Sequence, residues 1–123
     1  MTKGEVVQTF FSRFGMAAYA ASAVPKDRVF PYLTYDLIID TWEGGEVGLT
    51  VNLWFYTESE AIPNAKAQEI SAAIGSGGIV LPCDGGYVWI KRGSPWCQSL
   101  RDQSDPTIKR LYLNVSVEYL NKD

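Results

Sequence analysis

Residues 46–56, Glu-Val-Gly-Leu-Thr-Val-Asn-Leu-Trp-Phe-Tyr, decide the fold of this chain. Every second residue from Val47 to Phe55 is apolar, and a period of two is typical of a β-strand with one face against a core. Trp54 falls on the opposite face from these apolar side chains. The stretch therefore predicts a long strand that buries one side and exposes the other.

Two other stretches repeat this alternation. Residues 33–39 come before the strand 46–56 and are joined to it by the glycine-rich segment 41–45. We therefore expect these two strands to pair antiparallel. Residues 111–119, near the other end of the chain, alternate in the same way. The three strands predict a sheet with one covered face.

Helical spacing marks the elements expected to pack against this sheet. Residues 7–14 carry apolar side chains at i, i+3, i+4 and i+7, and Gly15 follows where a glycine cap would end a short amphipathic helix. Residues 59–74 place apolar side chains on one side and polar ones on the other, which predicts the covering helix. The segment 75–78, Gly-Ser-Gly-Gly, ends it.

The remaining segments predict short strands and a loop. Residues 16–24 are small and favour at most a weak strand, whereas residues 79–83 and 87–91 flank an Asp-Gly-Gly turn and predict a second hairpin. Residues 93–107 contain two prolines and a polar run, so we expect a mobile excursion there.

The predicted fold class is α/β of the α+β kind, in a single domain spanning residues 1–123. It is a mostly antiparallel sheet with one face covered by a helix, plus a short N-terminal helix and an extra β-hairpin. The expected core combines alternate strand residues with one side of the covering helix. Its members are Leu33, Tyr35, Leu37, Ile39, Leu49, Val51, Leu53, Leu113, Val115 and Val117 against Ile62, Ile70 and Ile74.

Composition excludes several classes of function. The 123 residues include no histidine, which removes histidine-based hydrolytic triads and histidine zinc sites. A net charge of −3 with only 11 lysines and arginines offers no electrostatic footprint for nucleic acid. No apolar run approaches the roughly twenty residues of a membrane span. We therefore expect no catalytic, cofactor-binding or metal-binding residues, no sequence-specific binding of nucleic acid and no contact with a membrane.

Cys83 and Cys97 are too far apart for a CxxC redox pair. Free cysteines are usually small buried side chains. The first residues lack the layout of a signal peptide, so we expect a cytosolic chain with two thiols and no structural disulfide.

Aromatic side chains are the best candidates for a binding site. Trp54 lies on the outer face of its strand, and the other three tryptophans fall at or near predicted turns, where a monomer would expose them. Such residues are enriched in protein interfaces, although a row of them can also form a platform for sugars. The candidate interface for another subunit or partner consists of Trp42, Glu43, Glu46, Trp54, Tyr87, Trp89, Lys91 and Trp96.

Three stretches together resemble the tail terminator, or tail completion, proteins of long-tailed bacteriophages. They are residues 30–35 (Phe-Pro-Tyr-Leu-Thr-Tyr), residues 45–54, and residues 57–65, which lead into a helix. Residues 82–87 and 93–97 resemble a narrower branch of that family. The resemblance covers roughly residues 30 to 75.

This resemblance implies a structural virion protein of the neck region, without enzymatic activity or cofactor and assembled in the host cytoplasm. Six copies would form a homomeric ring that caps the tail tube, ends its elongation and joins it to neck or connector proteins of the head, with DNA passing through the lumen. Two alternatives remain open. One is a head completion or connector protein of similar plan. The other is a monomeric carbohydrate-binding module that uses Trp42, Trp89 and Trp96 as stacking surfaces.

Overall fold

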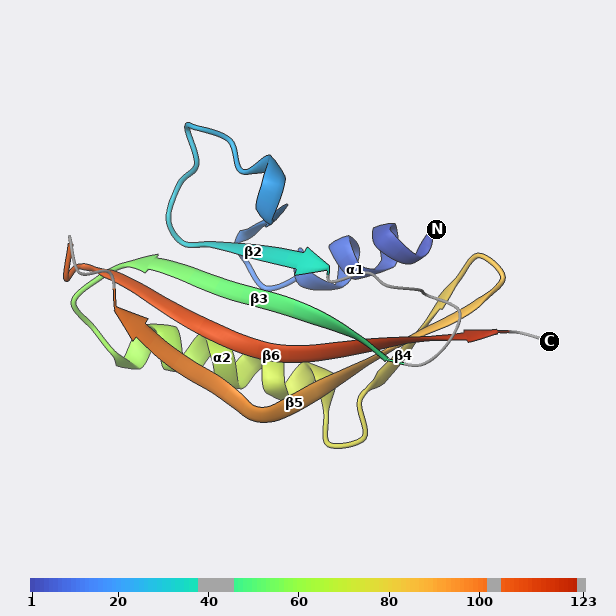
Figure 1. The fold of residues 1–123 in the computed structure, drawn as a ribbon. Coiled ribbons are helices and arrows are strands. Elements are labelled where there is room, and N and C mark those ends of the chain that lie inside the picture. The colour runs from blue at the N-terminus through green and yellow to red at the C-terminus, as the bar shows by residue number, and fades with distance from the viewer. Residues whose placement is uncertain (38–45, 102–104, 122–123) are drawn as a thin grey trace.

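The structure, a computed structural model, describes residues 1–37, 46–101 and 105–121. Its helices and strands follow one another in the order α1 (Lys3–Phe11), β1 (Ala17–Ala20), the 3-10 turn η1 (Ala21–Ala23), β2 (Tyr32–Leu37), β3 (Glu46–Tyr56), α2 (Ala61–Ile74), β4 (Ile79–Cys83), β5 (Gly86–Arg101) and β6 (Ile108–Asn121). The six strands form one curved sheet in the order β1-β2-β3-β6-β5-β4 (Figure 1).

The predicted fold class is wrong. In the residues that the structure describes, six strands form a mixed, half-barrel sheet accompanied by two helices. The sheet therefore makes up more of the fold than in a helix-covered antiparallel sheet. β1 pairs parallel with β2, and the other neighbouring strands are antiparallel. The hairpin of β4 and β5 is not an extra element, because β5 pairs with β6 and makes the hairpin part of the same sheet.

β5 is longer than expected because it passes through a bulge. The register with β6 shifts between Arg92 and Cys97, and pairing then continues to Arg101. Pro95 lies inside the shifted segment, where its missing N–H costs no ladder hydrogen bond. At Gly93 a Cβ atom would lie 2.7 Å from the Cβ of Asn114, so the strands approach too closely there for a larger residue. The predicted mobile excursion over residues 93–107 is therefore wrong for the part that belongs to β5.

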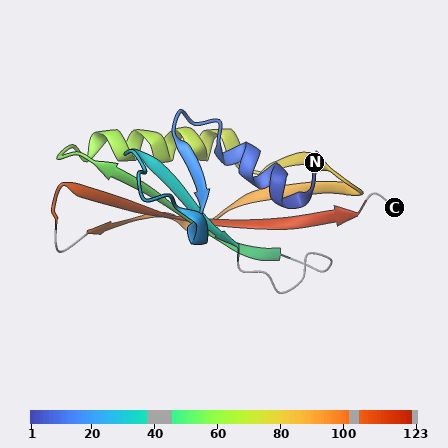
Figure 2. The same cartoon turned by 90° about the horizontal axis from the view of Figure 1, so that it is seen from above.

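The core lies between the two helices and one face of the sheet, which we call the covered face. Figure 2 shows α1 and α2 on the same side of the sheet. The predicted strand positions on this face are confirmed where the structure describes their side chains, except that Tyr35 is only partly buried. Ile39 lies outside the described residues. The confirmed strand positions are Leu33, Leu49, Val51, Leu53, Leu113, Val115 and Val117.

The predicted register of α2 is only partly right. Ile70 and Ile74 are buried as expected, but the side chain of Ile62 is 57% exposed. Pro63, at the third position of the helix, faces the core in its place, together with Ala67 and Ser71. The apolar pattern is ambiguous in the first turn, because both Ile62 and Pro63 can supply the first buried side chain.

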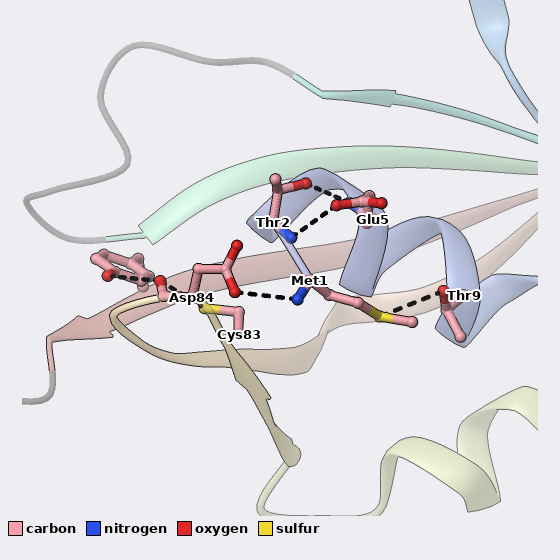
Figure 3. Close-up of polar contacts among 7 residues, drawn as sticks. Met1, Thr2, Glu5, Thr9, Cys83 and Asp84 are labelled. Atoms are coloured by element: carbon pink, nitrogen blue, oxygen red, sulfur yellow. Dashed lines mark hydrogen bonds and ion pairs between the residues drawn. The ribbon is translucent and has the colours of Figure 1, made fainter.

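α1 begins at a capping box and lies against the turn between β4 and β5 (Figure 3). The backbone N–H of Glu5 donates to the Thr2 hydroxyl at 3.2 Å, and the Thr2 N–H donates to the Glu5 carboxylate at 2.9 Å. The Met1 amino group pairs with Asp84 at 3.0 Å, and the Asp84 N–H donates to the Met1 carbonyl at 2.7 Å.

At its other end α1 reaches the opposite outer strand. The Gln8 side-chain amide donates to the Ala18 carbonyl of β1 at 2.9 Å. The helix ends at Phe11 and is capped by Ser12, so the predicted glycine cap at Gly15 is wrong, although Phe14 is still buried in the core. α1 therefore contacts both outer strands of the sheet.

Candidate functional site

The face of the sheet turned away from α1 and α2, which we call the open face, carries aromatic and charged side chains. Along β3 the buried residues Val51, Leu53 and Phe55 alternate with partly or fully exposed ones, among them Trp54 and Tyr56. This alternation places Trp54 opposite the core, as the sequence predicted. The open face divides into two clusters, one at each end of β3.

The first cluster, the aromatic patch, consists of Tyr19, Phe30, Tyr32, Trp54 and Tyr56. The register of β2 and β3 places Tyr32 directly beside Trp54, and their rings stack with centroids 6.0 Å apart and an interplanar angle of 10°. Tyr19 adds a ring 6.2 Å from Tyr32, and Phe30 lies 5.9 Å from Tyr56. Tyr32 is only 5% exposed, whereas Tyr56 is 60% exposed, so the patch has a covered base and an accessible margin.

Polar contacts hold the Trp54 ring in place. Its Nε1 donates to the hydroxyl of Thr34 at 3.0 Å, and Thr34 is buried. The Arg110 guanidinium lies 5.2 Å from the centroid of the Trp54 ring and donates through Nε to the Asn52 side chain at 3.0 Å. The aromatic patch is therefore pre-organised, with little side-chain freedom left to lose on binding.

The second cluster, the charged patch, consists of Glu46, Trp89, Lys91 and Glu118. Glu118 on the central strand β6 pairs with Glu46 on one side and with Trp89 on the other. Lys91 forms ion pairs with Glu118 at 3.0 Å and with Glu46, and its Nζ lies 4.2 Å from the centroid of the Trp89 ring. The Trp89 Nε1 donates to the Gly77 carbonyl at 2.8 Å.

The neighbouring carboxylates and the burial of Lys91 act on its pKa in opposite directions. Burial lowers it, but the hydrogen bonds and charges of Glu46 and Glu118 outweigh burial, so the pKa is raised above its ordinary value. Lys91 is therefore a fixed cation at neutral pH. The charged patch therefore holds a lysine cation between two carboxylates.

Three of the predicted interface residues come together in the charged patch: Glu46, Trp89 and Lys91. Tyr87 is on β5 two residues before Trp89 and is 41% exposed. Trp54 lies on the same face but in the aromatic patch.

The other predicted interface residues are elsewhere. Trp96 sits in the β5 bulge, is half-buried and packs against the hydrophobic core. Its Nε1 is buried without a hydrogen-bond partner in the part of the chain that the structure describes. Trp42 and Glu43 lie outside the described residues.

Sequence reasoning missed the partners that complete both clusters. Alternation alone indicates the face of each residue, but cross-strand neighbours depend on register. Tyr32 could have been found from the pairing of residues 33–39 with the following strand, because that pairing brings it beside Trp54. No signal in the sequence placed Arg110 or Glu118 near these tryptophans, since β6 is far away along the chain.

The surroundings of the two cysteine thiols do not activate them as nucleophiles. Cys83 and Cys97 are free and partly buried, and burial raises the pKa of each. A raised thiol pKa leaves little nucleophilic thiolate at neutral pH. Among the described residues, no group of three or more His, Cys, Asp or Glu side chains is arranged to hold a metal ion. None of the described helices combines the length and the apolar character that crossing a bilayer requires.

Comparison with known proteins gives a likeness of fold. No model of a known protein family matches the chain, and no curated protein matches its sequence. Among solved structures, the chain is similar to a chain of the virion of a native gene transfer agent particle. The TM-score is 0.61 at 17% sequence identity, and the match covers 89% of this chain and 83% of that chain. The two chains therefore share an overall fold across most of their lengths.

Proposed function

We propose that this chain is a structural virion protein that forms a homomeric ring of six subunits at the end of a tail tube. The ring ends tube elongation and provides the surface that joins the tail to neck or connector proteins of the head. The observation that carries the proposal is the likeness of fold to a gene transfer agent virion chain, which extends over most of both chains. The sequence resemblance to tail terminators supports the finer assignment.

The exposed features of the fold suit assembly. β1 and β4 are the outer strands of the sheet and have only four and five residues, so each leaves a short unpaired edge. The open face presents aromatic and charged residues that are fixed before binding. Subunits that meet head to tail satisfy such surfaces without leaving a free end when the ring closes.

The contacts of Trp89 and Trp96, the two tryptophans of the carbohydrate-binding alternative that the structure describes, argue against it. That alternative needs ring faces that are free to stack on sugars. Lys91 lies over the ring of Trp89, Trp96 packs against the core, and Tyr32 stacks on Trp54. We propose a role in protein contacts for this face, and no catalytic activity of the chain.

Polymerisation of tail tubes tests the proposed role. Tube protein is assembled with and without this chain, and tube lengths and ends are measured by negative-stain electron microscopy. We expect shorter tubes with an added ring at one end. Tubes that grow without limit while rings of this chain bind to purified head connectors would instead assign the chain to the head side of the neck. A chain that binds neither would contradict the proposal.

A further inference from the structure

Two arginines contact the stacked rings of the aromatic patch. Arg110 of β6 pairs directly with Trp54 of β3, and Trp54 pairs directly with Tyr32 of β2. The Arg110 guanidinium lies 5.2 Å from the centroid of the Trp54 ring, and the Arg28 guanidinium lies 5.9 Å from that of Tyr32. Each ring of the stack therefore has its own guanidinium. We call these four residues the arginine–aromatic cluster.

A hydrogen bond through Nε fixes each guanidinium in the cluster. Arg28 donates to the Tyr32 hydroxyl at 3.2 Å, and Arg110 donates to the Asn52 side chain at 3.0 Å. A guanidinium carries five N–H donors, and those on the Nη atoms of both arginines have no hydrogen-bond partner among the residues that the structure describes. The cluster therefore offers two positioned forks of free donors, the geometry that binds a carboxylate through two hydrogen bonds.

The chain supplies no carboxylate to either fork. Among the described residues, no Asp or Glu oxygen lies within 4.0 Å of a nitrogen of either arginine. Acidic residues do occur in the flanking segments: Glu60 pairs with Lys109 at 3.7 Å, Asp105 accepts the Thr107 N–H at 2.9 Å, Asp27 follows Lys26, and Glu58 is exposed in the loop after β3. Both guanidiniums therefore keep a positive charge that no contact within the described chain neutralises.

Apolar surface lies beside the cluster. Tyr56 is 60% exposed, and its ring lies 5.9 Å from Phe30, which in turn packs 5.2 Å from Tyr32. Val29, next to Arg28 in the chain, is 75% exposed. Such side chains gain free energy when another surface covers them. The cluster and its surroundings therefore fit a partner that carries both carboxylates and apolar side chains.

Nucleic acid is a poorer match for the cluster than a protein carboxylate. A phosphate also accepts two hydrogen bonds from an arginine fork, but single strands bind aromatic residues by stacking bases on free ring faces. The Trp54 ring lies between Tyr32 and Arg110 in the sheet, and Tyr32 is only 5% exposed. Neither ring of the stack therefore offers a free face to a base.

We propose that the arginine–aromatic cluster binds an acidic segment of a partner protein, with one carboxylate on Arg28, a second on Arg110 and an apolar side chain against Tyr56. The guanidiniums are already held by their rings and Nε hydrogen bonds, so binding costs little side-chain entropy. The proposal adds the chemistry of a partner to the proposed function and holds whether or not copies of this chain form a ring.

An NMR titration of the isotope-labelled chain tests this proposal, because the Nε–H groups of Trp54 and Arg110 give side-chain signals at the cluster. The probe is a capped peptide of glutamates and leucines, and the control peptide has glutamines in place of the glutamates. We expect the glutamate peptide to shift both signals and to bind more weakly as salt rises, since exposed charges are screened. The glutamine peptide should leave both signals unchanged.

Three variants locate the contact. Arg28→Gln and Arg110→Gln should each weaken binding of the glutamate peptide about tenfold, as for the loss of a hydrogen-bonded charge. Lys109→Gln is the matched control, because it removes a neighbouring positive charge that is already paired with Glu60, and it should bind like wild type. Circular dichroism shows whether each variant folds. Arg28 is exposed in a loop, so Arg28→Gln preserves the test if Arg110→Gln unfolds.

Several outcomes would overturn the proposal: no shift with the glutamate peptide, equal binding of the two peptides, or equal losses in Arg28→Gln and Lys109→Gln. An oligothymidylate that shifts the same signals at lower concentration than the peptide would also overturn it and would assign the cluster to nucleic acid. A glutamate peptide that binds as expected to a chain that never forms rings would support this proposal and contradict the proposed ring, so the two can fail separately.

Discussion

The two faces of the sheet differ in how far their residue environments follow from the sequence. On the covered face, Val51, Leu53 and Leu113 are fully buried, and their role follows from hydrophobic periodicity. On the open face, Trp54 and Lys91 take their environment from cross-strand neighbours that are distant along the chain. The covered face therefore determines whether the chain folds, and we propose that the open face and the outer strands of the sheet make the contacts with other subunits.

The largest expected effect comes from a charge on the covered face. Val51→Asp places a carboxylate at a fully buried position without a partner, which should cost more than about 4 kcal/mol and unfold the domain. Thr50→Asp, one residue earlier and on the open face, is the control and should fold. Urea denaturation followed by circular dichroism measures both. A Val51→Asp variant that melts like wild type would mean that the two faces are exchanged.

The next effect tests the register of α2. Ile70 is fully buried, so Ile70→Ala should lower the free energy of unfolding by about 2–5 kcal/mol, the range for large-to-small substitutions in cores. Ile62→Ala on the exposed side of the same helix should change it by less than about 0.5 kcal/mol. Equal losses in the two variants would contradict the observed register.

Substitutions of Trp96 and Trp89 distinguish an effect on stability from an effect on assembly. Trp96→Ala removes a side chain that packs against the core and should destabilise the fold by about 2 kcal/mol or more. Trp89→Ala should leave a folded protein whose assembly is weaker by about 2 kcal/mol, because Trp89 belongs to the charged patch. Thermal melts and mass photometry of both variants check this. An assembly defect confined to Trp96→Ala would show that the bulge, not the charged patch, is the contact.

The smallest effect is a pH dependence of the charged patch. The folded-state pKa of Lys91 is raised above its ordinary value of 10.5, so its contribution to stability is present below that value and is lost as pH rises through the folded-state pKa. The difference in melting temperature between wild type and Lys91→Gln should therefore shrink with increasing pH in the alkaline range. A difference that stays constant or grows would contradict the ion pairs with Glu46 and Glu118.

Sequence reasoning reached the elements of the fold but not their assembly into one sheet. Alternation located β3 and β6 because both strands bury one face. Pro95 and its polar neighbours indicated a loop, and a bulge that keeps such residues inside a strand leaves no separate signal. The small residues of β1 have no clear alternation, so the sequence gives little signal for this strand. Its parallel pairing with β2 depends on the folded topology.

The candidate site was predictable to a smaller extent. The outward position of Trp54 follows from the period of its strand, and Trp89 and Lys91 share a face because they are two residues apart. Their contacts depend on β6, which lies between β3 and β5 in the sheet although it comes last in the sequence. That strand order cannot be predicted from periodicity. The ion pairs of Lys91 with Glu46 and Glu118 are therefore apparent only in the structure.

We propose that the chain assembles into a ring through surfaces outside the covered face. Mass photometry of the purified protein, alone and mixed with tail tubes, is the decisive experiment. We expect one discrete species that contains six copies of the 13.7 kDa chain, free in solution or bound at tube ends. A chain that stays monomeric at micromolar concentration and leaves tail tubes unoccupied would contradict it.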